Sequence, residues 1–267
     1  MSRKYYKSIL FVLVGLFCLF PKTIFAAEKE KEYDLNKHNH ITISQSESYG
    51  ASGNYTWLKY VPAENGCLTI QMLSLEGSTD PATGYIALYN SSKSSRLSSK
   101  AIYYNTTHKN NPFWYVFTFG VRKNQTYYVR VRGDNAVTVS GTFTKINDKA
   151  GSSKTKARVL KKNKNRTGMI PAGTSETDWY KIKLTKQKRL RLYYSAKTSG
   201  SFRMTIYRGK QMIGRQNIYY TSGERKIVLY QYSTTTKKKS GVKKGNYFVT
   251  IERANTASSG SYKLRWN

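Results

Sequence analysis

The phrase GVKKGNYFVTI, from Gly241 to Ile251, nearly repeats an earlier phrase, GVRKNQTYYVRV, from Gly120 to Val131. Each begins with a glycine and a valine, continues through two basic residues and a short turn, and ends with apolar residues at every second position. Such alternation indicates a half-buried antiparallel strand. In the later copy, Gly245 can adopt the positive φ of a tight turn, and Tyr247 is expected to face the core.

Further landmarks recur in the same order along the chain. The correspondences are Trp57 with Trp179, residues 85–89 with 202–207, and Ser140-Gly141 with Ser259-Gly260. Their offset of about 120 residues is longer than the 20 to 50 residues of a solenoid unit. The chain therefore reads as a tandem duplication of one domain.

Both copies contain many short segments in which apolar and polar residues alternate. Examples are 182–184, 190–192 and 262–266, where Ile, Leu, Tyr and Trp alternate with Lys and Arg. Gly and Asn turn signals separate the segments, and no stretch beyond the N-terminal region shows a convincing helical period. We expect an all-β chain of two tandem antiparallel β-sandwich domains, jelly-roll-like in form, after a signal-peptide helix.

The N-terminal region has the pattern of a secretory signal. Arg3, Lys4 and Lys7 precede an apolar run at 9–20, and small residues follow at Ala26. The run is shorter than the ~20 residues that a membrane-spanning helix needs, although an uncleaved anchor helix is the alternative. We expect a secreted, extracellular protein without a transmembrane anchor, associated with the cell wall.

The predicted domain organisation follows from these patterns. It comprises a signal peptide at 1–26, a flexible lead at 27–39, a first β-sandwich at 40–146, a linker that starts the second domain at 147–156, and a basic β-sandwich at 157–267. The linker is rich in Gly and Ser near its centre, so a fixed angle between the domains is not expected.

Charge is distributed very unevenly between the two copies. The net charge is +32, and residues 150–267 contribute 28 Lys and Arg against 4 Asp and Glu. Residues 27–149 carry 14 basic and 10 acidic side chains. A field of this sign concentrates polyanions at the surface and makes their binding sensitive to salt.

The alternation also predicts which cations point outward from the second sandwich. If Ile182, Leu192 and Leu264 face the core, their basic neighbours share outer faces, where strands ~4.8 Å apart could align them into a plate. The candidate binding residues are Lys181, Lys183, Arg189, Arg191, Lys263 and Arg265, with Tyr194 and Tyr220 as exposed rings beside them. The alternative is that basic strands only keep the sheet soluble and protect its edges.

The second copy also carries a set of short motifs. They are Asn147-Asp148, GMIPAG at 168–173, DWYKI at 178–182, GNYFV at 245–249 and SGSY at 259–262. This set resembles bacterial pre-peptidase C-terminal domains over residues 147–267, with a diverged copy at 40–146. The resemblance implies a small jelly-roll sandwich that acts mostly as a non-catalytic targeting or substrate-binding module.

Some members of that family bind calcium. In this sequence Asn147, Asp148 and Asp178 match positions of that kind, but the family's richer acidic run is absent and lysines lie nearby. Calcium takes six to eight oxygen ligands. These three residues are therefore weak calcium candidates, no metal or cofactor is predicted, and Asp178 could instead cap a turn.

Signatures of catalysis are missing from the sequence. There is no Gly-x-Ser-x-Gly elbow and no phosphate-cradling glycine loop before a helix. Few carboxylates are available for acid–base pairs, and Cys67 has no evident histidine partner or second cysteine for an intramolecular disulfide. We therefore do not expect an enzyme.

The hypotheses that remain concern binding. The first is a module that attaches to an anionic polysaccharide or teichoic-acid-like polymer of the cell envelope. The second is binding of extracellular DNA, for which basic grooves with aromatic rings are suited. The third is an accessory module for a separately encoded exported enzyme.

Overall fold

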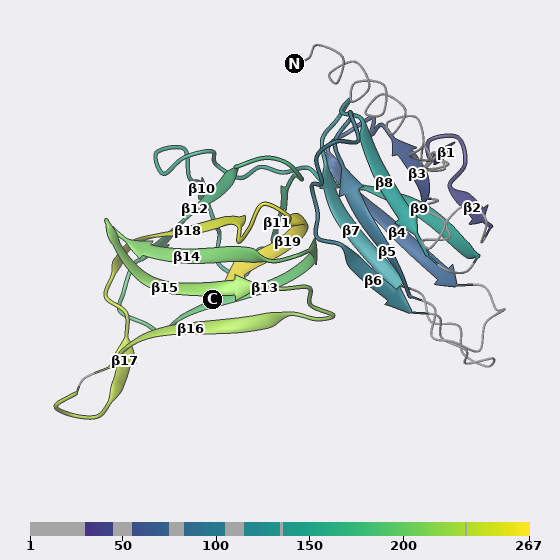
Figure 1. Cartoon of the computed structure of the whole chain (residues 1–267). Coiled ribbons are helices and arrows are strands. Elements are labelled where there is room, and N and C mark those ends of the chain that lie inside the picture. Colours follow the sequence, from purple (N-terminus) through teal and green to yellow (C-terminus); the bar gives the residue numbers. More distant parts are fainter. Residues whose placement is uncertain (1–29, 45–54, 75–82, 105–114, 134–135, 233) are drawn as a thin grey trace, which may run out of the picture.

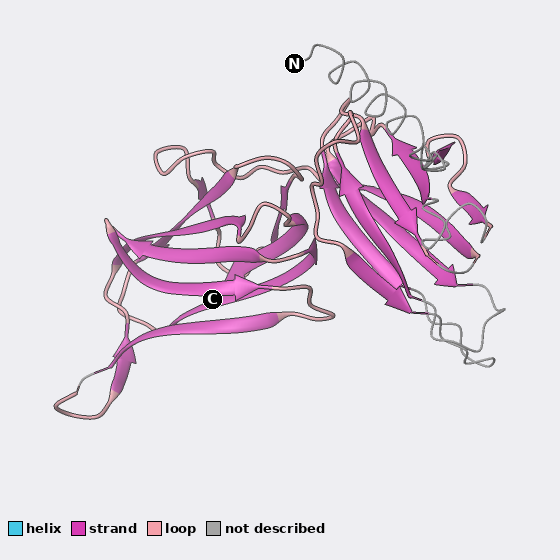
Figure 2. Cartoon of the chain, in the orientation of Figure 1, coloured by secondary structure: helices cyan, strands magenta, loops and turns pink. Residues whose placement is uncertain are grey.

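The computed structural model describes residues 30–44, 55–74, 83–104, 115–133, 136–232 and 234–267. The signal peptide and its helix, expected at 1–26, lie outside the described residues. Within the described ranges every regular element is a strand, and none of these segments is a helix long and apolar enough to cross a membrane (Figure 2). The all-β class of tandem antiparallel sandwiches is confirmed.

In the part of the chain that the structure describes, the first sandwich contains nine strands (Figure 1). They are β1 (Glu30–Asp34), β2 (His40–Ile43), β3 (Tyr55–Tyr60), β4 (Gly66–Ser74), β5 (Thr83–Tyr89), β6 (Ala101–Tyr104), β7 (Tyr115–Val121), β8 (Tyr127–Arg132) and β9 (Val137–Lys145). One sheet has the order β1-β3-β8-β5-β6 and the other has the order β2-β9-β4-β7. Leu58, Ile70 and Val129 are fully buried between them.

The second sandwich contains ten strands among its described residues. They are β10 (Arg158–Val159), β11 (Arg166–Ile170), β12 (Thr177–Leu184), β13 (Leu190–Ser199), β14 (Phe202–Arg208), β15 (Gln211–Ile218), β16 (Arg225–Tyr232), β17 (Lys239–Gly241), β18 (Gly245–Arg253) and β19 (Ser259–Trp266). We call β10-β12-β18-β14-β15 the β12 sheet and β11-β19-β13-β16-β17 the β13 sheet. Ile182, Leu192 and Ile206 are fully buried between these sheets.

The repeated phrase forms equivalent turns in the two sandwiches. Tyr247 is fully buried at the start of β18, and its hydroxyl donates to the carbonyl of Lys243 (2.6 Å). In the first sandwich the hydroxyl oxygen of Tyr127 accepts the N–H of Arg122 (3.0 Å). Gly245 has a φ of 143°, as its turn requires. The phrase thus encodes a turn that is fixed by the tyrosine following it.

The segment expected to be a flexible lead, 27–39, contains an ordered strand, so that expectation is corrected. β1 pairs in parallel with β3 at the edge of its sheet. The Tyr55 hydroxyl donates to Glu30 (2.6 Å), and Leu35 is buried in the core of the first sandwich. Charged residues suit an edge strand that exposes one face, and the apolar Leu35 anchors the segment.

The segment 147–156, expected to be a flexible linker, is bound to the second sandwich. The Asp148 carboxylate accepts the N–H groups of Ala150 (2.8 Å) and Met169 (2.9 Å). Gly151 and Trp179 exchange backbone hydrogen bonds of 3.1 and 2.8 Å. Local hydrogen bonding therefore overrides the flexibility that the Gly and Ser content suggested.

The two sandwiches are also in direct contact, contrary to the expectation of no fixed angle. Strand β7 packs against β13 and β19 (Figure 1). The carbonyl of Gly120 accepts the N–H of Ala172 (2.9 Å), and its N–H donates to the Ser259 hydroxyl (3.3 Å). A Cβ at Gly120 would lie 2.4 Å from the Ile170 carbonyl oxygen. The glycine of the repeated phrase thus allows the backbones of the two domains to meet.

Candidate functional site

The six predicted cations lie on the second sandwich but do not form one plate. Lys181 and Lys183 lie on the outer face of the β12 sheet. Arg191, Lys263 and Arg265 lie on the outer face of the opposite sheet, in β13 and β19. The expectation of a single surface is therefore wrong, because consecutive strands of a sandwich can belong to different sheets and alternation does not reveal which.

The cations of the β13 sheet have specific neighbours. Arg265 donates two hydrogen bonds to Glu224 (2.8 and 2.5 Å), and its guanidinium carbon lies 3.9 Å from the centroid of the Tyr193 ring. Lys263 and Lys197 line a cleft of about 380 Å³ against the first sandwich. This part of the predicted surface therefore faces the other domain.

The remaining predicted residues have different environments. Arg189 is exposed just before β13, and Tyr220 is 57% exposed after β15. Tyr194, by contrast, packs against the core of the second sandwich, so it is not the outward ring that we expected. In a Tyr-Tyr pair on a strand only one ring faces out, and here it is Tyr193.

Sequence reasoning missed a cluster of cations at one end of the second sandwich. Burial lowers the pKa of Lys188, and the charges of Lys162, Arg191 and Lys186 lower it further. The Lys188 amine lies 5.3 Å from the centroid of the Trp266 ring. We call Lys162, Lys186, Lys188 and Arg191 the Lys188 cluster. Sequence patterns did not reveal this cluster, because Lys162 lies far from the other three residues along the chain.

The few acids of the second half are already engaged. Glu224 pairs with Arg265, Glu252 with Arg203 (3.7 Å), and Glu176 with Arg122 of the first sandwich. Asp178 accepts a hydrogen bond from the Tyr262 hydroxyl (2.5 Å). Among the described residues from 150 onward, Arg203 and Arg265 are the only cations paired with a carboxylate. Most of the positive charge is thus uncompensated.

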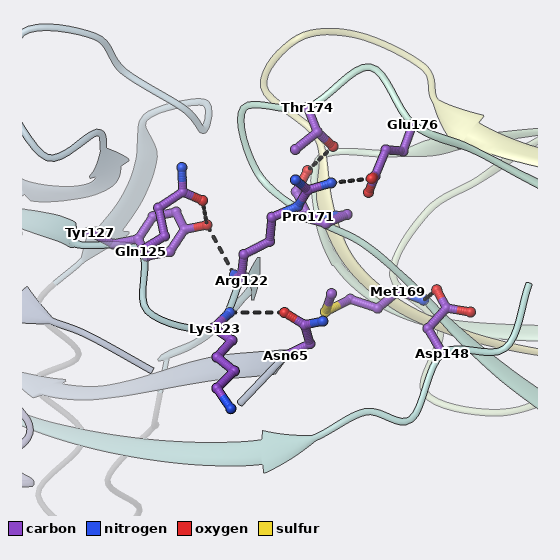
Figure 3. Close-up of polar contacts among 10 residues, drawn as sticks. All are labelled: Asn65, Arg122, Lys123, Gln125, Tyr127, Asp148, Met169, Pro171, Thr174 and Glu176. Atoms are coloured by element: carbon purple, nitrogen blue, oxygen red, sulfur yellow. Dashed lines mark hydrogen bonds and ion pairs between the residues drawn. The ribbon is translucent and has the colours of Figure 1, made fainter. Parts of the chain in front are cut away.

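A larger cleft of about 680 Å³ lies between the two domains, and Figure 3 shows the polar contacts of several residues that line it, among them Arg122 and Glu176. The first sandwich contributes Asn65, Arg122 and Lys123, and Lys123 donates its N–H to Asn65 (2.9 Å). The second sandwich contributes Glu176, which pairs with Arg122, and Trp179. The turn of the earlier repeated phrase therefore forms one wall of this cleft.

Two of the three weak calcium candidates meet at the wall of this cleft. Burial, followed by the charge of Asp148, raises the pKa of Asp178 to about 8. Asn147 lines a separate pocket beside Lys145 and Lys149. Within the described ranges no three His, Cys, Asp or Glu side chains form a group suited to a metal ion. Asp148 and Asp178 are instead engaged within the protein, Asp148 with the N–H groups of Ala150 and Met169 and Asp178 with the Tyr262 hydroxyl.

Comparisons with known proteins give structural neighbours only. No family model matches the chain, and no curated protein matches it. A solved structure of tripeptidyl peptidase 2 aligns with 86% of the chain at 8% identity and a TM-score of 0.32, and the chain spans 22% of that protein.

Two bacterial structures are also similar. The pre-peptidase C-terminal domain of a Bacillus anthracis collagenase aligns with 44% of the chain and 96% of its own length, at 17% identity and a TM-score of 0.26. The CBM22-1-CBM22-2 tandem of Paenibacillus barcinonensis Xyn10C aligns with 78% of the chain and 81% of its own length, at 6% identity and a TM-score of 0.26. These values denote a weak resemblance of fold and carry no functional argument.

Proposed function

We propose that the chain is a secreted, non-catalytic binding protein that attaches to an anionic polymer of the cell envelope through its second sandwich. The polymer would be an acidic polysaccharide or a teichoic-acid-like chain. One observation carries the proposal. The second half has 28 basic and 4 acidic residues, and all four acids are already bound to partners within the protein.

Uncompensated charge of this size has an energetic consequence. Like charges repel one another in the compact state, and the repulsion opposes folding. In the Lys188 cluster this repulsion contributes to the lowered pKa of Lys188. A bound polyanion would relieve the repulsion, so the cluster supports binding of repeated negative groups.

Extracellular DNA is the second candidate ligand. Tyr219 and Tyr220 are 61% and 57% exposed in the loop after β15, where they could stack on unpaired bases. The accessory-module hypothesis predicts instead a partner protein in the culture supernatant. Direct competition between polymers separates these possibilities.

The test uses residues 27–267 applied to immobilised teichoic acid, polygalacturonate and single-stranded DNA across a salt series. We expect retention that weakens steeply as salt rises. Replacing Lys162, Lys186 and Lys188 by Gln should weaken binding by roughly a hundredfold, because each cation near an anionic surface contributes about 1 kcal/mol.

A matched control removes the same charge from the first sandwich, at Lys37, Lys59 and Lys100. It should affect retention much less. Retention that ignores salt, or an equal loss in the control, would refute the proposal. Preference for DNA over both envelope-type polymers would favour the second candidate.

A further inference from the structure

Three aromatic rings lie on the outer face of the β12 sheet. They are Trp179 on β12, Phe248 on β18 and Tyr207 on β14, and we call them the aromatic platform. Phe248 is the cross-strand neighbour of Tyr207, and the Trp179 and Tyr207 rings stack with centroids 6.2 Å apart and planes 20° apart. All three rings are partly exposed. Aromatic side chains that are exposed together on one face of a sheet are typical of a binding surface.

The first sandwich has the same rings on its equivalent face. Trp57 and Tyr89 occupy the positions of Trp179 and Tyr207, and Tyr128 occupies that of Phe248. There the face is closed, because Trp57 is only 2% exposed. The two sandwiches therefore hold equivalent clusters of aromatic rings, and in the first sandwich other side chains cover that cluster.

Cations of the first sandwich fill its cluster. The Arg130 guanidinium lies 4.9 Å from the Tyr89 ring centroid and 5.7 Å from that of Trp57. The Lys93 amine lies 5.2 Å from the Trp57 centroid. In the second sandwich the position of Arg130, opposite the tryptophan, is held by the shorter Thr250. The second platform therefore lacks the internal guanidinium that closes the first.

Positive charge surrounds the open platform. Lys181 is the cross-strand neighbour of Phe248, and the Lys154 amine lies 5.1 Å from the Phe248 ring centroid. Arg215 is exposed on β15 of the same sheet. The outward acid on β18 is Glu252, which is paired with Arg203. The Lys154 amine also donates to the Gly209 carbonyl (2.6 Å), but neither it nor Lys181 is paired with a carboxylate among the described residues. Rings flanked by such cations suit a ligand that has both apolar faces and negative groups.

We propose that the aromatic platform binds the sugar rings of an acidic polysaccharide, an inference that rests on the proposed function and names its ligand class. The C–H face of a sugar ring packs on Trp179 and Tyr207, while Lys181 and Lys154 hold its carboxylates. Trp179 also lines the 680 Å³ cleft, so a polysaccharide chain can continue from the platform toward Arg122 and Lys123. Polyphosphate chains have no apolar ring face and gain nothing from the platform.

The experiment measures the affinity of residues 27–267 for two probes, polygalacturonate and inorganic polyphosphate. The variant Trp179→Ala/Tyr207→Ala should bind polygalacturonate about tenfold more weakly, as expected when ring contacts worth ~1.4 kcal/mol are lost. Its affinity for polyphosphate should change by less than about twofold, because its charge is unchanged. Trp179→Phe keeps a ring and should retain most of the polygalacturonate affinity.

Tyr230→Ala is the matched control, since Tyr230 is 42% exposed on β16 of the opposite sheet. It should bind both probes as the parent chain does. If the parent binds both probes and the platform variant loses neither or loses both equally, the platform proposal fails while the proposed function stands. If the parent binds neither probe at low salt, the proposed function itself fails, and the platform proposal with it.

Discussion

Replacing Asp178 by Asn should remove most of the loss of stability that the parent chain suffers between about pH 4 and pH 8. Burial and the charge of Asp148 raise the pKa of Asp178 from 3.8 to about 8. Across this window the folded chain keeps the proton and the unfolded chain releases it. The stabilising contribution is therefore complete below the unfolded pKa and is lost as the pH rises through the folded pKa.

The slope of the free energy of unfolding against pH sets the size of this effect. One proton retained on folding changes the free energy of unfolding by at most about 1.4 kcal/mol per pH unit. Urea unfolding of the parent and of Asp178→Asn at pH 5 and pH 8 measures this difference. Asp34→Asn is the control, because Asp34 accepts a hydrogen bond from Asn36 at an exposed turn. Equal stability of the parent chain at the two pH values would contradict the assignment.

Replacing Gly120 by Val should separate the two domains. The added Cβ would lie 2.4 Å from the Ile170 carbonyl oxygen and 3.0 Å from the Gly260 nitrogen, and both are backbone atoms that cannot rotate away. The hydrogen bonds of Gly120 to Ala172 and Ser259 would be lost together. Overpacking of this kind costs about 1–3 kcal/mol.

Small-angle X-ray scattering should detect the separation as a larger radius of gyration, and thermal unfolding should detect the lost contact. Gly223→Ala is the matched control, since a Cβ there meets no atom within 4 Å. A Gly120→Val chain with the scattering and melting of the parent would show that this interface does not hold the domains together.

The sequence was most informative where a pattern is local. Alternation placed Ile182 and Leu184 in the core, and the repeated phrase predicted both the positive φ of Gly245 and the buried ring of Tyr247. These features depend on neighbouring residues alone, because strand period and turn chemistry act over a few positions.

Features that depend on tertiary structure could not be predicted in this way. Alternation separates inside from outside but does not tell which sheet of a sandwich a strand joins, so Lys181 and Arg191 were wrongly given one surface. The Lys188 cluster unites loops distant in sequence. The sequence repeat aligned Trp57 with Trp179, Tyr89 with Tyr207 and Tyr128 with Phe248, but it did not show that these rings share one face of a sheet. The Arg130-to-Thr250 difference became informative once the strands were in register.

Cys67 is buried, and its pKa is raised to about 11 chiefly by that burial. Its side chain, however, lines the narrower cleft together with Ser261 and Lys197 of the other domain. Because thiolates rather than thiols are the nucleophiles, this group should resist alkylating reagents while the cleft is closed. The Cys67 thiol is therefore an intrinsic chemical reporter, because the rate at which it is alkylated would measure how often the two domains separate.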